Sequence, residues 1–238
     1  MASSLAPLAA HPLDRVLAAV AASPGLCVFD LDSTLFDNRP RQALILRELG
    51  VAIGEPLLAR VLPEHFRTWD LAAAMRNAGL SGERAAALAQ PAARFWKERF
   101  FSSAYCRHDV PVPGAVAFVA EVRRLGAPVA YLTGRPHQME AGTLAALAAA
   151  GFPLPEPPAV RLFLKPDPGM GDDLWKERAG ADLARLGPVA ALFDNEPAHI
   201  NGYRRLYPRA ACIHLATDDS GRPIPLLDGI TSVGDFRR

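Results

Sequence analysis

Five short runs of apolar residues, each ended by polar, glycine or proline positions, predict buried β-strands in this chain. Between them lie longer stretches in which apolar residues recur with the period of an amphipathic helix. Strands that alternate with helices in this way indicate β/α units, and therefore a doubly wound α/β domain with a parallel sheet. The predicted strands are Leu26–Phe29, Val129–Leu132, Val160–Leu164, Val189–Phe193 and Cys212–Leu215. The predicted helices are His11–Ala22, Ala115–Leu125, Met139–Ala150 and Leu174–Leu186.

The stretch between Leu35 and Val112 has a different texture, with helical patterns and no strand-like run. We therefore predict a small all-helical domain at residues 36–112, inserted after the first strand of an α/β core made of residues 1–35 and 113–238. The expected helices are Arg41–Leu49, Pro56–Leu62, Glu64–Ala78, Glu83–Gln90 and Ala92–Phe101, separated in part by glycines. The aromatic side chains expected to pack these helices into a bundle are Phe66, Trp69, Phe95, Trp96 and Phe100.

Two carboxylates stand where the first predicted strand ends, in the run Asp30-Leu31-Asp32-Ser33-Thr34. Side chains alternate along an extended chain, so Asp30 and Asp32 are expected to point the same way. The carboxyl ends of strands in an open parallel sheet are where ligands bind. Two acids this close repel each other unless a cation or a shared proton relieves them. An oxygen-liganded ion such as Mg²⁺ is the expected cofactor.

Three later segments add groups that suit phosphoryl transfer. The second strand ends in Thr133-Gly134-Arg135, which offers a hydroxyl, a glycine and a cation. Two candidate lysines, Lys165 and Lys176, follow the third strand, and a further strand ends in Asp194. A transferring phosphoryl group spreads negative charge over its oxygens, so catalysis depends on positioning and charge stabilisation. A hydroxyl, a lysine and an acidic metal site, each following its own strand, supply both.

Taken together, these motifs resemble those of the haloacid dehalogenase-like superfamily of aspartate-nucleophile phosphatases. The D-x-D-x-T motif of that family falls on Asp30, Asp32 and Thr34, and its hydroxyl motif on Thr133-Gly134. The resemblance covers residues 25–35 and 110–215, and the helical insertion is similar to the cap domain of the family. It implies a Mg²⁺-dependent hydrolase that cleaves a phosphate monoester through an aspartyl-phosphate.

The resemblance also implies a role for each motif residue. Asp30 is expected to attack phosphorus, and Asp32 to protonate the leaving oxygen and later take a proton from water. Thr133 and Gly134 are expected to hold phosphate oxygens, with Arg135 and Lys165 as further substrate contacts. The expected metal ligands are Asp30, the Asp32 carbonyl and Asp194.

The choice between the two lysines stays open at this point, with Lys176 favoured as the catalytic one. Lys165 directly follows a strand, but Pro166 and Pro168 then force a loop. Asp172 and Asp173 are expected to cap the next helix, which places Lys176 in its first turn. A lysine there opposes the helix dipole and indicates an anionic partner nearby.

The acidic motif departs from the commonest family pattern, because Asn195 and Glu196 follow Asp194. Asn195 offers only an amide oxygen, and Glu196 either hydrogen-bonds metal-bound water or opens the following helix. His199 is expected to be structural and is left outside the site. The sequence does not identify the leaving group of the substrate. The candidate residues for reading it are Asn38, Arg39, Arg41, Arg67 and Arg99.

The composition of the chain narrows the classes of protein to which it can belong. The 238-residue chain has a formal net charge of +1, which gives no electrostatic signature for nucleic acid or membrane. A small phosphorylated substrate is expected, and a phosphorylated polynucleotide end stays open. The three cysteines lack a C-x-x-C spacing and are expected to be free thiols. No basic residue precedes the alanine-rich start, so no cleaved signal peptide is expected, and we predict a cytoplasmic monomer or weak homodimer.

Rival functions stay open at this stage. Within the same fold the chain is also compatible with a phosphomutase or a dehalogenase. Asp32 favours ester hydrolysis over dehalogenation, because an alcohol leaving group needs a proton. From another class, a non-catalytic binding module on an inherited fold is the alternative.

Overall fold

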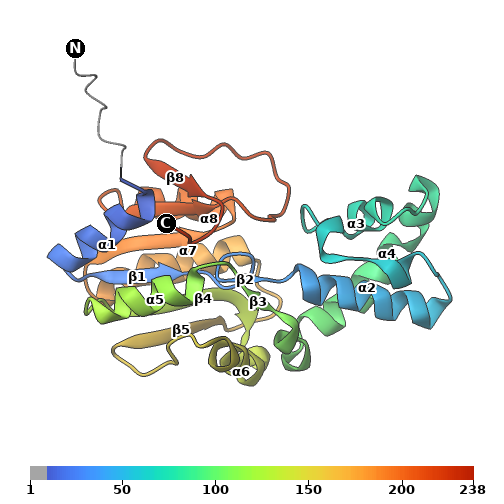
Figure 1. Ribbon diagram of the computed structural model, residues 1–238, viewed down its shortest axis with the longest axis horizontal. Helices are drawn as coiled ribbons and strands as arrows, with labels where there is room; N and C mark the ends of the chain where they lie inside the picture. Colours follow the sequence, from blue (N-terminus) through green and yellow to red (C-terminus); the bar gives the residue numbers. More distant parts are fainter. Residues whose placement is uncertain (1–9) are drawn as a thin grey trace, which may run out of the picture.

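A parallel β-sheet forms the centre of the protein in the computed structural model, which describes residues 10–238. Within these residues six strands join in the order β5-β4-β1-β6-β7-β8 (Figure 1). Their bounds are β1 (Leu26–Phe29), β4 (Val129–Pro136), β5 (Val160–Lys165), β6 (Val189–Asp194), β7 (Ala211–Leu215) and β8 (Ile230–Val233). The five predicted strands and the doubly wound α/β class are confirmed. The edge strand β8 escaped prediction, because its run Ile-Thr-Ser-Val is short and half polar.

Helices cover both faces of the sheet. α1 (Pro12–Ala22), α5 (Ala115–Arg124) and α6 (Glu140–Ala150) pack on one face, and α7 (Asp172–Asp182) and α8 (Pro197–Leu206) pack on the other. The strand residues divide accordingly, because alternate side chains leave a strand on opposite faces. Cys27 and Phe29 of β1 belong to the first apolar layer, whereas Leu26 and Val28 belong to the second. β1 is thus buried on both faces, which fixes the position of the residues that follow it.

The inserted segment forms a helical lobe beside the sheet (Figure 1). It contains α2 (Arg39–Ile53), α3 (Leu71–Asn77) and α4 (Gly82–Phe100), with short 3₁₀ turns η1 (Leu58–Arg60), η2 (Pro63–His65) and η3 (Ser103–His108). An antiparallel pair, β2 (Phe36–Asp37) with β3 (Val110–Pro111), joins the two connections to the core. The lobe has its own apolar core, which includes Leu46, Leu58, Phe66, Met75 and Leu88. It is therefore a cap with an interior separate from that of the sheet.

Several predicted helix bounds in the cap were wrong. The expected break between Gln90 and Ala92 does not occur, because α4 continues through Pro91. Pro91 is exposed, and so is Ala87, whose carbonyl loses its helical partner and faces water instead. The expected helix over Glu64–Ala78 is divided into η2 and α3, with the extended Phe66 between them.

The five aromatic side chains expected to pack the helical bundle divide into two groups. Phe66 and Phe95 belong to the apolar core of the cap or pack against it. Trp69, Trp96 and Phe100 instead form a separate aromatic cluster, with the ring planes of Trp96 and Phe100 stacked at a centroid distance of 4.3 Å. Sequence spacing alone does not distinguish an aromatic residue of the interior from one that faces a neighbouring domain.

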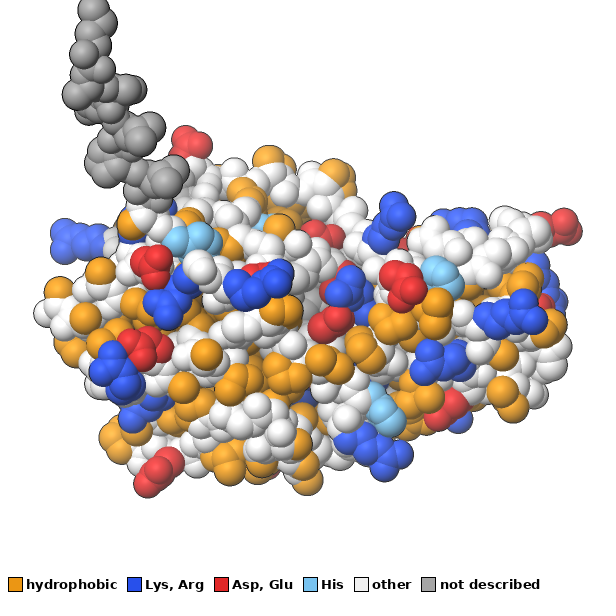
Figure 2. Space-filling view, in the orientation of Figure 1, with side chains coloured by type: hydrophobic (Ala, Val, Ile, Leu, Met, Phe, Trp, Pro, Cys, Tyr) orange, Lys and Arg blue, Asp and Glu red, His pale blue; other side chains and the backbone are white. Residues whose placement is uncertain are grey.

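Other features of the chain complete the description. Within the described residues, Cys27, Cys106 and Cys212 are buried free thiols, and no helix is both long enough and apolar enough to span a membrane. The start of the chain, for which we predict no cleaved signal peptide, lies largely outside the described residues. Basic and acidic side chains are interspersed on the face shown in Figure 2.

Candidate active site

Asp30 and Asp32 lie at the carboxyl end of the central strand β1. The backbone N–H of Asp30 still donates to the carbonyl of Phe193 on the adjacent β6, at 2.9 Å, so Asp30 is held by the sheet ladder. The chain then turns sharply at Ser33, whose φ of 60° lies in the left-handed region. The N–H of Ser33 donates to the side-chain oxygen of Asn38 at 2.8 Å, which stabilises this turn. Both aspartates consequently line one cavity.

A lysine from α7 joins Asp30 to the end of β6. Nζ of Lys176 donates to Asp30 Oδ1 at 2.5 Å, to Asp194 Oδ2 at 2.9 Å and to the carbonyl of Leu132 at 2.7 Å. All three charged side chains are buried. We call Asp30, Lys176 and Asp194 the lysine cluster. Two carboxylates and one ammonium give this cluster a formal charge of −1.

The environment shifts the pKa values in the lysine cluster in opposite directions. Burial, together with the charges of Asp194 and Asp32, raises the pKa of Asp30 to about 7 against the lowering effect of Lys176. Burial also opposes the charge on Asp194, but the Lys176 ammonium outweighs it and lowers the pKa of Asp194 well below its usual range. Burial disfavours the Lys176 ammonium, yet Asp194 and Asp30 hold its pKa well above the usual range. The positive charge of Lys176 therefore compensates the negative charge of Asp194 more completely than that of Asp30.

Asp32 belongs to a second buried group of charges. Arg135 binds it with two hydrogen bonds, from Nε to Oδ2 and from Nη2 to Oδ1, both at 2.8 Å. Nη2 of Arg41, from helix α2 of the cap, reaches Asp32 Oδ1 at 2.7 Å. Asp109, beside β3, contacts both arginines, at 2.7 Å from Arg135 Nη2 and 3.0 Å from Arg41 Nε. We call Asp32, Arg41, Arg135 and Asp109 the arginine cluster; its formal charge is zero.

The arginine cluster keeps Asp32 ionised. Burial favours its neutral form, but the guanidinium groups of Arg135 and then Arg41 outweigh burial and lower the pKa of Asp32 to about 2. Bidentate guanidinium–carboxylate pairs also fix orientation, because two parallel hydrogen bonds define a plane. Asp32 is thus held as a carboxylate with a fixed direction.

The residues after the second strand lie next to Asp32. Thr133 is buried, and its hydroxyl lies 3.4 Å from Asp32 Oδ2 while accepting the N–H of Arg135 at 3.1 Å. Gly134 lines the cavity, and a Cβ placed on it would lie 2.7 Å from a carboxylate oxygen of Asp172. The glycine therefore lets the helix start at Asp172 approach the strand closely. These residues border the site, and their predicted contacts with phosphate stay predictions.

The two candidate lysines occupy different environments. Lys176 contacts Asp30, whereas Nζ of Lys165 pairs with Asp172 Oδ1 at 2.5 Å and borders a separate cavity with Pro136 and Gln138. The helix around them also differs from expectation. α7 begins at Asp172 after the N-cap Gly171, so Asp172 and Asp173 lie inside its first turn, and Lys176 lies one turn further on. The predicted cap and first-turn position were therefore wrong, although an anionic partner is present.

The residues after Asp194 shape the other side of the site. The side-chain oxygen of Asn195 accepts the hydroxyl of Thr34 at 3.1 Å, which connects the motif after β1 to the end of β6. The carboxylate of Glu196 accepts the N–H and the hydroxyl of Ser220, at 2.7 and 2.9 Å, in the loop after β7. This contact gives Glu196 a structural role in holding that loop. Glu196 stands at the N-cap of α8 but provides no side-chain cap.

Sequence reasoning left His199 outside the site, yet its ring lines the cavity. Nδ1 lies 3.4 Å from Asp194 Oδ1, and Nε2 lies 3.0 Å from Asp173 Oδ1. Burial lowers the pKa of His199, but Asp194 more than reverses this effect and raises it. His199 occupies the third position of α8, so the start of that helix turns it back toward Asp194. The sequence signal for this contact was the position of His199 near the start of the helix that follows Asp194.

Asp109 and Arg222 were missed altogether. Asp109 lies near the end of the cap segment, 77 positions beyond Asp32, with no motif around it. Arg222 belongs to the loop after β7 and forms an ion pair with Asp173 at 2.6 Å at the rim of the cavity. The only sequence signal for Asp109 was its place directly before the second connection, where a chain returns to the core.

The five candidate substrate-reading residues of the cap do not converge on the cavity. Arg41 is buried in the arginine cluster, and Asn38 donates to Asp109 at 2.8 Å. Arg39 pairs with Asp37, and with Arg67 it borders another cavity of about 590 Å³. Arg99 lies over the ring of Phe95. Among the described residues of the cap, aromatic side chains line the site instead, at Trp69, Phe100 and Phe101.

The lysine cluster has the donors expected of a magnesium site. Lys176 donates to one oxygen of Asp30 and one of Asp194, and these two carboxylates together with the Asp32 carbonyl are the oxygens that would hold a cation. Within residues 10–238, no three His, Cys, Asp or Glu side chains group as a metal centre. Two carboxylates and a carbonyl suit Mg²⁺, because it keeps several waters and needs few protein ligands. The negative formal charge of the cluster favours the same ion.

A model of the haloacid dehalogenase-like hydrolase family matches residues 24–177, which is more than half of the chain. A search of curated proteins gave no significant match.

Solved structures with a similar fold include Protein Tyrosine Kinase A (PtkA) from Mycobacterium tuberculosis, at 18% identity and a TM-score of 0.57. The match covers 89% of this chain and 94% of that one. Another is a protein from Bacteroides fragilis assigned to the haloacid dehalogenase-like hydrolases, at 10% identity and a TM-score of 0.50. It covers 89% of this chain and 99% of that one. At these identities the likeness concerns the fold.

Proposed function

Because this chain belongs to the haloacid dehalogenase-like hydrolases, we propose that it is a Mg²⁺-dependent phosphatase. In this proposal it hydrolyses a phosphate monoester of a small molecule through an aspartyl-phosphate intermediate. The cap at residues 36–112 closes over a core made of residues 1–35 and 113–238. We further propose that the protein works in the cytoplasm as a monomer or weak homodimer.

Asp30 is the nucleophile in this mechanism. One carboxylate oxygen attacks phosphorus, the bond to the leaving oxygen breaks, and phosphate is carried covalently until water releases it. Lys176 holds the other oxygen at 2.5 Å, which fixes the direction of attack and compensates the charge that gathers as phosphate approaches. The raised pKa of Asp30 indicates an anionic site that lacks a positive charge. A bound cation makes up this deficit.

Asp32 supplies the proton transfers. Held as a carboxylate by Arg135 and Arg41, it has the form that takes a proton from the water attacking the aspartyl-phosphate. Asp32 then releases this proton to water, and the negative phosphate of the next substrate favours its protonated form again, from which the leaving oxygen takes a proton. Thr133 lies beside Asp32 at 3.4 Å, and Arg135 lines the cavity. In this proposal both contact phosphate oxygens. Gly134 adds an approachable backbone N–H.

Asp30, Asp194 and the backbone carbonyl of Asp32 are the groups that would hold Mg²⁺. When bound, this ion neutralises phosphate charge and brings nucleophile and phosphate together. Lys176 would compensate part of the charge of the two carboxylates and the phosphate, and the ion would compensate the rest. The backbone N–H of Glu196 donates to Asp194 Oδ1 at 2.9 Å, and this hydrogen bond orients the Asp194 carboxylate.

The observation that carries the proposal is the Lys176 bridge between Asp30 and Asp194 at the ends of β1 and β6. The test measures phosphate release from a panel of phosphate monoesters with Mg²⁺, after EDTA, and after Mg²⁺ is restored. We expect activity that EDTA abolishes and Mg²⁺ recovers. Product analysis with sugar phosphates distinguishes hydrolysis from phosphate migration within the sugar.

Asp30→Asn gives the sharpest check of the mechanism. The amide has nearly the same shape and no nucleophilic carboxylate, so turnover should fall by more than about 10³-fold while the fold persists. Circular dichroism and thermal unfolding serve as controls for the fold. Turnover near that of the wild-type protein in a folded Asp30→Asn variant would rule out the aspartyl-phosphate.

A further inference from the structure

Resting on the phosphatase function proposed above, we propose that the substrate carries an aromatic ring next to its phosphate. The ring would pack against Trp69 and Phe101 of the cap, which are partly exposed; with Phe100, which is 2% exposed and supports them, they form what we call the aromatic wall. No feature of the catalytic groups themselves selects such a substrate. The preference for an aromatic substrate would come from the cap side chains that line the cavity.

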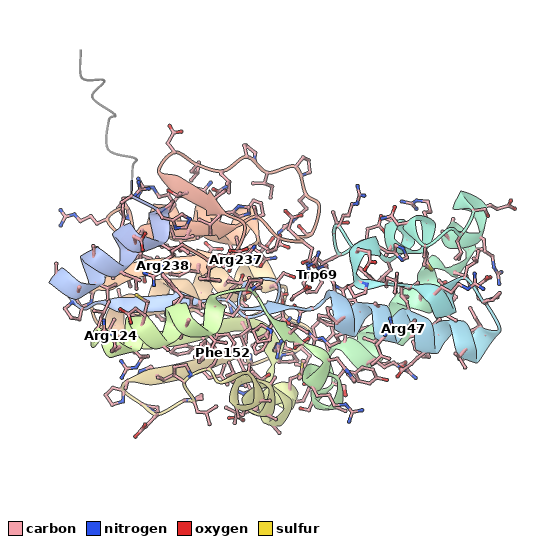
Figure 3. The ribbon with its side chains drawn as sticks, in the orientation of Figure 1. Arg47, Trp69, Arg124, Phe152, Arg237 and Arg238 are labelled. Atoms are coloured by element: carbon pink, nitrogen blue, oxygen red, sulfur yellow. The ribbon has the colours of Figure 1, made fainter. Side chains whose placement is uncertain are left out.

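The cavity has two chemically different sides. It has a volume of about 230 Å³, enough for a small phosphate ester. Asp30, Lys176 and Asp194 lie at the sheet side, where phosphate would bind. The aromatic wall forms the cap side, and Figure 3 shows Trp69 between the cap and the sheet. A group attached to phosphate therefore extends from charged residues toward aromatic rings.

The aromatic wall is held in place before any substrate binds. The rings of Trp69 and Phe100 meet edge to face at a centroid distance of 5.2 Å, and those of Phe100 and Phe101 do so at 5.3 Å. Trp96 stacks behind Phe100. The N–H of Trp69 donates to the carbonyl of Asp219 at 2.9 Å, which ties the wall to the loop after β7. Rigid rings bind a flat apolar group without a large loss of entropy.

The wall is also joined to the catalytic groups. The guanidinium carbon of Arg41 lies 3.8 Å from the ring centroid of Phe100, and Arg41 also binds Asp32. A ring seated on the wall would thus lie near the acid–base residue. This places the oxygen between ring and phosphorus beside Asp32, as ester cleavage requires.

The cap offers this cavity no polar side chain. All residues from 36 to 112 are described, and within them only the three members of the wall line the site. A polyol would lose hydrogen bonds to water here without gaining partners from the cap, which disfavours it. An aromatic ring gains apolar burial and favourable ring–ring contacts.

The polar groups at the core side of the rim are already paired with one another. Glu196 accepts two hydrogen bonds from Ser220, and Arg222 pairs with Asp173. A hydroxyl group of a sugar would have to displace these contacts. The rim therefore does not replace the polar partners that the cap lacks.

The test compares benzyl phosphate with glycerol 3-phosphate. Both release a primary alcohol, so they differ mainly in the ring. We expect kcat/KM for benzyl phosphate to exceed that for glycerol 3-phosphate by about tenfold or more, as ring packing and apolar burial predict. Trp69→Leu should remove most of this preference by raising KM for benzyl phosphate. Glycerol 3-phosphate should be affected less than about twofold, since it gains little from the wall.

A matched control is Phe95→Leu, which changes a cap aromatic that packs on the cap core and lies away from the cavity. It should keep the benzyl preference. Phe101→Leu is a second wall variant, used if Trp69→Leu loses its fold by circular dichroism. Preference unchanged in a folded wall variant would overturn the proposal.

Binding without turnover separates this proposal from the catalytic one. Calorimetric titration with benzylphosphonate and with 2-hydroxyethylphosphonate measures how much the aromatic wall contributes to binding affinity. If neither ester is hydrolysed but benzylphosphonate binds more tightly in a Trp69-dependent way, the wall stands and the phosphatase proposal falls. If both esters are hydrolysed at similar kcat/KM and both phosphonates bind equally, the wall falls and the phosphatase proposal stands. If neither phosphonate binds and neither ester is hydrolysed, both proposals are overturned.

Discussion

Two groups of buried charges meet at the end of β1, and they differ in balance. The lysine cluster is built only from core elements and has one cation for two carboxylates. The arginine cluster joins core and cap and has two cations for two carboxylates. A group with a formal charge of −1 is prepared for another positive charge, whereas a neutral, mutually hydrogen-bonded group is complete. This difference agrees with the proposal that the first cluster binds a metal ion and carries the chemistry, while the second positions Asp32.

The same contrast appears in the pKa values. Asp30 in the lysine cluster has its pKa raised to about 7, first by burial and then by neighbouring carboxylates. Asp32, two residues away and slightly more exposed, with 13% of its side chain accessible against 8% for Asp30, has its pKa lowered to about 2, because Arg135 and Arg41 overcome the effect of burial. Neighbouring charge, more than depth, therefore separates the two aspartates. The experiments below change the clusters one at a time.

Removal of the cation from the lysine cluster should have the largest effect. In Lys176→Ala, Asp30 and Asp194 face each other without the ammonium, so kcat should fall by about 10²- to 10³-fold. Lys165→Ala is the comparison, because Lys165 pairs with Asp172 and should change KM more than kcat. Steady-state kinetics of both folded variants on one substrate checks this. The assignment is reversed if Lys165→Ala is inactive and Lys176→Ala is active.

Disruption of the arginine cluster should act mainly on stability. Arg41→Met leaves Asp109 and Asp32 sharing Arg135, and removal of one partner from a buried ion pair typically costs about 3–5 kcal/mol of the free energy of unfolding. The double variant Arg41→Met/Asp109→Asn should recover part of this loss, since one carboxylate then meets one guanidinium. Urea unfolding of the three proteins gives the values.

Arg39→Met is a matched control for that experiment. The ion pair of Arg39 with Asp37 is more exposed, with 41% of the Arg39 side chain accessible, and should contribute less than about 1 kcal/mol. A loss in Arg41→Met no larger than that in Arg39→Met would show that the arginine cluster does not stabilise the contact between core and cap.

The smallest effect concerns pH and Mg²⁺. The pKa of Asp30 is about 7 in the folded protein and near 4 in an unfolded chain, so between these values the folded state binds a proton that the unfolded state has lost. The stability of the metal-free protein should therefore fall as pH rises from about 4 to 7 at this site. In the proposed site Mg²⁺ would take the place of the proton on Asp30, so it should raise Tm more at pH 8 than at pH 5.5.

The arginine cluster provides the internal reference for this measurement. Asp32 titrates near pH 2 and stays charged throughout that range, so its contribution should not change. Differential scanning calorimetry of the wild-type protein and Asp30→Asn, each with and without Mg²⁺, isolates the effect of Asp30. An equal Tm increase at both pH values would contradict the link between Asp30 and the metal ion.

Local patterns in the sequence predicted the sheet and the strand ends at which the candidate site lies. The apolar run Leu26–Phe29 is short, buried on both faces and followed by Asp30 and Asp32. Such a run predicts a buried strand from the local sequence alone. The same reasoning placed Asp194 at the end of β6. Helix bounds were less secure, as α4 shows by continuing through Pro91, because the cost of a proline depends on whether the freed carbonyl meets water.

Only the tertiary structure decided which charges meet. The sequence favoured Lys176 over Lys165 but left the choice open, and the fold brings Lys176 to Asp30. Asp109 has no motif, yet it lies between Arg41 and Arg135, because the two cap connections pair as β2 and β3. The wall containing Trp69 likewise depends on how the cap lies against the sheet. Local preferences act over a few residues, whereas contacts between distant segments depend on the packing of whole layers.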